Sequence, residues 1–170
     1  MRKLFAKRLG KKLDPSEQKV IDDIAQFGCH VMLVFDDEGD RPDFAYSIGF
    51  PVTVKQPEVI IHGLKRELMH SMLNSLCKQC AEGLVLEEGT RIEGLVEGFD
   101  CIAKKVTDPE AIKEHFGWAM WYHRSQHNRV LNDVIQVVWP GAQDGLFPWD
   151  AGCSGIVIAQ QPALYTMSLH

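Results

Sequence analysis

The sequence predicts a single compact α+β domain in which a mostly antiparallel sheet of about five to six strands is packed by two to three helices. Three observations predict this class. The chain has 170 residues, 45% of them hydrophobic and 24% charged, which suits one globular domain. Apolar segments of strand length, separated by tight turns, outnumber segments with helical spacing. The two kinds of segment do not alternate regularly, which argues against a doubly wound parallel sheet.

The first helix is expected to begin after Asp14. Asp14 suits the N-cap, Pro15 the first helical position and Glu17 the third, which is the arrangement of a capping box. Apolar residues then recur at helical spacing until Gly28. The pattern therefore predicts a helix that ends at this glycine.

Two strands are expected next, over residues 29–35 and 43–50, with an acidic turn between them at residues 36–40. This spacing is typical of an antiparallel pair. A third, short strand over residues 59–61 is rich in β-branched side chains and leads to His62 and Gly63.

Residues 64–82 carry the broadest apolar stripe in the chain and predict a helix that lies across the sheet and ends at Gly83. Further strands are expected over residues 84–86, 99–106 and 133–139. Asp108 is predicted to cap a helix that runs to about Arg124. Five carboxylates crowd one region here and predict a solvated acidic loop, the alternative being a site for a cation or a basic partner: Glu87, Glu88, Glu93, Glu97 and Asp100.

Charge is unevenly distributed along the chain, whose formal net charge is −5. Residues 1–13 hold six basic residues and no acid, so we expect a basic N-terminal tail (1–13) before the domain (14–170). Phe5, Leu9 and Leu13 repeat every four residues, as in a basic amphipathic helix that contacts a membrane surface, an acidic partner or nucleic acid. The alternative, which the sequence favours, is a solvated tail.

A cytoplasmic location is expected from the cysteines and the N-terminus. The five cysteines are an odd number, and the N-terminus lacks the apolar core of a signal peptide. Reduced thiols are the rule in the cytosol. No apolar run has the length of a membrane span.

No motif indicates a metal or a cofactor. Cys77 and Cys80 form a CxxC, but both lie on the apolar stripe of a predicted helix, where cysteine behaves as a small hydrophobe. His115, His123 and His127 form a loose cluster near two arginines, which favours a solvated helix end over a metal pair. We therefore expect no metal site, and the chain has no motif for zinc, a nucleotide or a flavin.

The candidate binding residues come from several segments. Tyr46, Ser47 and Gly49 combine a phenol, a hydroxyl and a glycine at a strand end. Because loops cluster at one end of a sheet, we expect the turn with Phe147 and Trp149, and also Arg124, to lie near them. His30 and His62 sit at strand ends where each could face a cleft, although a hydrogen-bonded structural histidine is the alternative.

Several sequence blocks carry a family resemblance over residues 14–164. The chain resembles the bacterial DUF4262 family in blocks that arrive in the family order, namely 28–31, 44–50, 57–64, 88–91, 116–119 with Tyr122 and Arg124, 136–140 and 145–149. One departure is Gln56, where the family pattern usually has histidine. The family has no established activity, so the resemblance implies a domain and no mechanism.

Two classes of function remain open. The first, which we favour, is a binding or interaction module, such as an accessory, immunity or anti-defence protein, whose acidic body meets a basic surface of a partner protein. An acidic body argues against nucleic acid as the partner. The alternative is a small enzyme or ligand-binding protein with a pocket near Tyr46, His30, His62 and Arg124. Since no constellation of nucleophile and base is evident, the sequence leans away from an enzyme.

Overall fold

Six strands form one sheet in the computed structural model, which describes residues 12–167. Most of the basic tail expected over residues 1–13 lies outside these residues. The sheet has the order β1-β2-β3-β6-β5-β4, and every neighbouring pair is antiparallel except β3 and β6. The predicted class, α+β with a mostly antiparallel sheet, is therefore confirmed. The strands are β1 (His30–Val34), β2 (Phe44–Ile48), β3 (Glu58–His62), β4 (Arg91–Val96), β5 (Phe99–Val106) and β6 (Val134–Val138).

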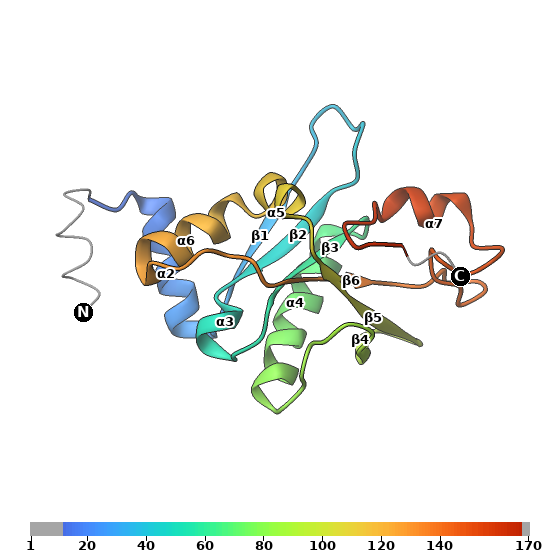
Figure 1. Ribbon diagram of the computed structural model, residues 1–170, viewed down its shortest axis with the longest axis horizontal. Coiled ribbons are helices and arrows are strands. Elements are labelled where there is room, and N and C mark those ends of the chain that lie inside the picture. The colour runs from blue at the N-terminus through green and yellow to red at the C-terminus, as the bar shows by residue number, and fades with distance from the viewer. Residues whose placement is uncertain (1–11, 168–170) are drawn as a thin grey trace.

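Helices cover both faces of this sheet (Figure 1). On one face lies α4, and on the other lie α2, α5 and α6. The described residues hold six helices, more than the two to three expected, because two are very short and one predicted helix is divided. The helices are α2 (Pro15–Phe27), α3 (Phe50–Thr53), α4 (Arg66–Ala81), α5 (Pro109–His115), α6 (Gly117–His127) and α7 (Gly155–Gln160).

The central strand β3 separates the two halves of the core. Val59 and Ile61 pack with α4, whereas Ile60 packs with α2, α5 and α6 on the opposite face. All residues of β3 are buried, which explains why its sequence is a continuous apolar run after Glu58. Glu58, the first residue of β3, therefore lies in the middle of the sheet.

The local signals around α2 are confirmed in detail. The Glu17 backbone N–H donates to Asp14 Oδ1 at 2.8 Å, and the Asp14 N–H donates to Glu17 Oε1 at 3.2 Å. Gly28 ends the helix in the left-handed conformation, with φ of 90°. The capping box and the terminal glycine thus set both ends of this helix.

Two predictions between α4 and β5 are wrong. Residues 84–86 form no strand, because the Leu86 N–H donates to the side-chain Oε1 of Gln56 at 2.7 Å and not to a neighbouring strand. The expected acidic loop instead contains β4. Ile92 and Leu95 are buried against the core while Glu93 faces solvent, so the segment is amphipathic and pairs with β5.

The helix expected from Asp108 to about Arg124 is divided at Phe116. This residue is completely buried and has φ of −109° and ψ of 34°, outside the helical region. Burial of the Phe116 side chain beneath α5 and α6 fixes the bend, and Gly117 begins α6. Among the described residues, no helix is both long enough and apolar enough to cross a membrane.

Candidate functional site

Glu58 is a completely buried carboxylate at the first position of β3. Four donors surround it. The Ser47 hydroxyl and the Phe50 N–H donate to Oε1 at 2.8 and 3.1 Å. The Gly49 N–H lies 2.8 Å from Oε2, and the His123 Nε2 lies 2.7 Å from the same oxygen. Donors on both oxygens satisfy the buried carboxylate and hold it in one orientation.

The turn between β2 and α3 supplies two of these donors because of its glycine. Gly49 has φ of 114°, a left-handed conformation that turns its N–H and that of Phe50 inward. A Cβ at this position would lie 3.0 Å from Cγ1 of Ile24 on α2. Glycine is therefore required both by the backbone conformation and by the close approach of α2.

His123 joins α6 to the sheet through Glu58. Its side chain is 4% exposed and lines a cavity, whereas the Glu58 side chain does not. Because the carboxylate accepts the hydrogen bond from Nε2, this nitrogen carries a proton, and Nδ1 is the basic nitrogen of the neutral ring. The geometry is that of an imidazole oriented by a carboxylate.

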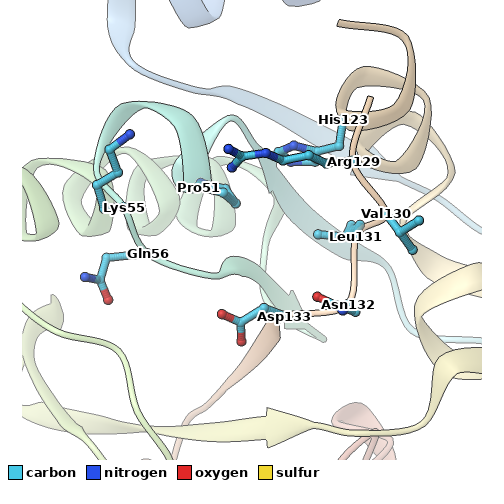
Figure 2. A pocket seen from close by; sticks show the side chains of 9 residues that line it. All are labelled: Pro51, Lys55, Gln56, His123, Arg129, Val130, Leu131, Asn132 and Asp133. Carbon is cyan, nitrogen blue, oxygen red and sulfur yellow. The ribbon is translucent and has the colours of Figure 1, made fainter. Parts of the chain in front are cut away.

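The cavity beside His123 has a volume of about 320 Å³. Figure 2 shows Lys55 and Gln56 on one side of it and Arg129 and Leu131 on the other. The first two follow α3, and the second two follow α6. The lining residues are Pro51, Lys55, Gln56, His123, Arg129, Val130, Leu131, Asn132 and Asp133. The cavity thus has two cationic side chains, one carboxylate and the oriented imidazole.

Lys55 adopts an unusual backbone conformation for its residue type. Its φ is 59°, in the left-handed region, which costs a residue with a side chain about 1–2 kcal/mol. Such conformations are often found at functional sites, where the position of the side chain matters more than local stability. The conformation places a lysine at the border of the cavity.

Three of the residues expected at a site lie at or next to Glu58. Ser47 and Gly49 are two of its four donors. Tyr46 is buried, and its hydroxyl accepts the Trp118 N–H at 3.1 Å at the start of α6. Burial raises the pKa of Tyr46 to about 12. Tyr46 therefore positions the helix that carries His123 and does not itself line the cavity.

Arg124 and His30, which were also expected at a site, lie outside the cavity. Arg124 is exposed next to His123, and Arg129 lines the cavity instead. His30 is paired with Asp23, with 2.7 Å between Nδ1 and Oδ2. Burial alone would raise the pKa of Asp23, but hydrogen bonds from His30 and Lys19 outweigh it and leave the pKa lowered.

His62 is 2% exposed at the far end of β3 from Glu58. Its ring packs against Phe44 and His115, and its Nδ1 has no hydrogen-bond partner among the described residues. Burial, with a smaller contribution from the charge of His115, lowers the pKa of His62 to about 3. This histidine is a neutral part of the core.

The structure does not bring Phe147 and Trp149 to the Tyr46 end of the sheet. Their rings stack at 5.0 Å and pack with Tyr165, whereas Tyr46 belongs to the core under α6. Figure 1 shows the segment around α7 well separated from α6. The reason is strand direction: β6 runs parallel to β3, so the chain leaves β6 at the His62 end, while β2 ends beside Glu58.

Sequence reasoning missed the Glu58–His123 pair. His123 was grouped with His115 and His127, and Glu58 received no role. One signal was present, because Glu58 is an acid immediately before an apolar strand, where a carboxylate is buried only if it has donors. Gln56, the position that departs from the family pattern, lines the cavity and accepts the Leu86 N–H.

Metal ligands are not gathered in the part of the chain that the structure describes. Residues 12–167 contain no group of three or more histidine, cysteine, aspartate or glutamate side chains placed to hold an ion. Cys77 and Cys80 are buried on the core face of α4.

Fold and cavity together define a three-layer α+β domain with a buried carboxylate–histidine pair at the edge of a pocket. The chain belongs to the DUF4262 family, whose model, described as a domain of unknown function, matches residues 23–154. Glu58, His123 and every residue that lines the cavity fall within this range. No curated protein and no solved structure matches the chain.

Proposed function

We propose that the protein binds a small anionic molecule in the cavity between α3 and α6, and that His123 exchanges a proton with it. The observation that carries this proposal is the Glu58–His123 hydrogen bond beside a cavity bordered by Lys55 and Arg129. Two cations at one opening favour a carboxylate or phosphate group. A volume of about 320 Å³ lies at the lower end of the range for small-molecule sites.

His123 is suited to acid–base chemistry by its contact with Glu58. The carboxylate holds Nε2 and fixes the ring, so that Nδ1 is the nitrogen available as a base. A carboxylate behind an imidazole also stabilises the cation that forms when the ring takes up a proton. The proposed reaction class is therefore proton transfer to or from a bound anion.

The other polar groups in the cavity would orient this molecule. Asp133 and Asn132 lie before β6, across the opening from Lys55. Asp133 would accept hydrogen bonds from an amine or hydroxyl of the ligand, while Leu131 contributes apolar surface. A few placed polar groups among apolar ones are typical of a specific site.

Anion binding is tested by titration with inorganic phosphate and with succinate. The ¹⁵N and ¹H NMR signals of the His123 ring report the binding. Lys55→Ala and Arg129→Ala should each weaken binding by about 10-fold, as expected for one charged hydrogen bond. Lys113→Ala is the matched control, since it removes the same charge from the exposed side of α5. Equal affinity in all four proteins contradicts the proposal.

Proton exchange is tested separately with His123→Gln. The glutamine amide can still donate to Glu58, so the variant keeps the anchor of α6 while it loses the base. The probe here is inorganic sulfate, whose charge does not change between pH 5 and pH 8. We expect wild type to bind it more tightly at pH 5 than at pH 8, and the variant to lose most of that difference. If the Glu58–His123 pair only supports the fold, the affinity will depend on pH in the same way in both proteins.

The first hypothesis, interaction with a basic surface of a partner protein, is favoured by one further observation. A hollow of about 490 Å³ beside the turn between β1 and β2 is lined by four acids and one cation, namely Asp36, Glu38, Asp40, Glu114 and Arg41. Binding of an oligolysine peptide tests it. The double variant Asp40→Asn, Glu114→Gln should weaken that binding, and a peptide that binds both proteins equally speaks against this surface.

A further inference from the structure

The side chain of Cys29, which directly precedes β1, lies next to that of Cys77, which is on the core face of α4. Their thiols form a hydrogen bond, and both residues are buried, at 3% and 6% exposure. Cys29 Sγ also lies 3.7 Å from Oδ1 of Asn74, one turn before Cys77 on the same helix. The Cys29 side chain therefore points at α4, toward the helix face that carries Asn74 and Cys77.

The Cys77 sulfur lies just beneath the surface at Gly28. A Cβ on this glycine would be only 3.3 Å from Cys77 Sγ, and Gly28 itself is half-buried. The Gly28 carbonyl oxygen accepts the Thr53 hydroxyl at 2.6 Å in an exposed hydrogen bond. Gly28 has no side chain to cover the sulfur, and Cys77 is 6% exposed, so this is the side from which a small oxidant would reach it.

We propose that Cys29 and Cys77 are a redox-active pair that hydrogen peroxide converts into a disulfide. In the first step the Cys77 thiolate attacks one peroxide oxygen, so that an S–O bond forms, the O–O bond breaks and the released hydroxide takes up a proton as water. In the second step the Cys29 sulfur attacks Cys77, the S–S bond forms, and the S–O bond breaks with loss of a second water. Two thiols are oxidised and one peroxide is reduced.

The roles of the two sulfurs follow from their environments. The hydrogen bond from Cys29 lowers the pKa of Cys77, against the effect of burial. The same hydrogen bond, together with burial, raises the pKa of Cys29. Cys77 is thus the attacking thiolate and Cys29 the resolving thiol. Cys80 lies one turn further along α4, where burial raises its pKa to about 11, so it is the poorer nucleophile.

The test uses the full chain, reduced and then treated with hydrogen peroxide before its free thiols are blocked by alkylation. We expect a product lighter by two hydrogens before alkylation, with two thiols protected and a cross-linked pair of peptides that contains Cys29 and Cys77. In Cys29→Ser, Cys77 should instead stop as a sulfenic acid that dimedone labels. Cys101→Ser is the matched control, because Cys101 is equally buried in the same core, and it should form the disulfide as wild type does.

Two results would overturn the proposal. One is a cross-link between Cys77 and Cys80. The other is a native protein that forms no disulfide under conditions in which the urea-unfolded chain does. Because both are read on the wild-type chain, the test stands even if a cysteine variant fails to fold.

Discussion

The His123 Nε2 lies 2.7 Å from the Glu58 Oε2, although the two residues are 65 positions apart in the chain. This contact joins α6 to the central strand of the sheet and brings an imidazole to the edge of a cavity. Since both side chains are almost completely buried, the contact affects the stability of the fold as well as the proposed chemistry.

Glu58→Gln should lower the free energy of unfolding by about 2–4 kcal/mol. A glutamine side chain has one acceptor oxygen and one NH₂ group, so at least one of the four donors around Glu58 would face another donor. Urea denaturation measures the change. Glu93→Gln on the exposed side of β4 is the control and should stay within about 0.5 kcal/mol of wild type.

Tyr46→Phe should cost about 1–2 kcal/mol, because it removes the acceptor of the Trp118 N–H at the start of α6. Tyr165→Phe is a matched control. The Tyr165 hydroxyl is buried and has no hydrogen-bond partner among the described residues, so its removal should be neutral or stabilising. Thermal unfolding of both variants tests this. Equal losses of stability in the two variants would mean that the hydrogen bond between the Tyr46 hydroxyl and the Trp118 N–H does not stabilise the fold.

Lys55→Gly should raise stability while it weakens anion binding. Relief of the left-handed backbone, about 1–2 kcal/mol, exceeds the loss of about 0.4–1 kcal/mol from the more flexible unfolded chain. We therefore expect a gain of about 0.5–1 kcal/mol in urea denaturation, together with weaker phosphate binding. Asn128→Gly has the same backbone geometry, with φ of 51°, and lies outside the cavity lining, so its phosphate affinity should not change.

Stability should fall as the pH drops from about 6.5 toward 3, and His62 should be one cause. Its pKa is lowered from 6.5 to about 3 in the folded state, so in this range the unfolded chain binds a proton at position 62 that the folded chain does not. Above pH 6.5 the free energy of unfolding does not change through His62. Between about pH 6.5 and pH 3 it falls by about 1.4 kcal/mol for each pH unit. His62→Gln does not titrate, and its unfolding free energy should depend less steeply on pH. Parallel curves for the two proteins would contradict this origin.

The parts of the fold that depend on neighbours in sequence were predictable from the sequence. Asp14 and Glu17 cap α2, Gly28 ends it, and the apolar stripe of α4 faces the core, because these features depend on residues within one or two helical turns. The strand expected over residues 99–106 matches β5, Phe99–Val106. The strand β4 was missed, because its buried residues Ile92 and Leu95 are three positions apart, across a register shift in the pairing with β5, so the sequence shows no alternation.

The cavity and the contacts around it depend on the tertiary structure. Ser47 and Gly49 were expected at a site. Their hydrogen bonds to Glu58, and the contact between Glu58 and His123, depend on which strands pair and which helix covers them. The parallel pairing of β3 with β6 likewise separates Trp149 from Tyr46. Periodicity and caps reflect local backbone preferences, whereas burial of a charged side chain depends on donors that distant segments supply only in the folded chain.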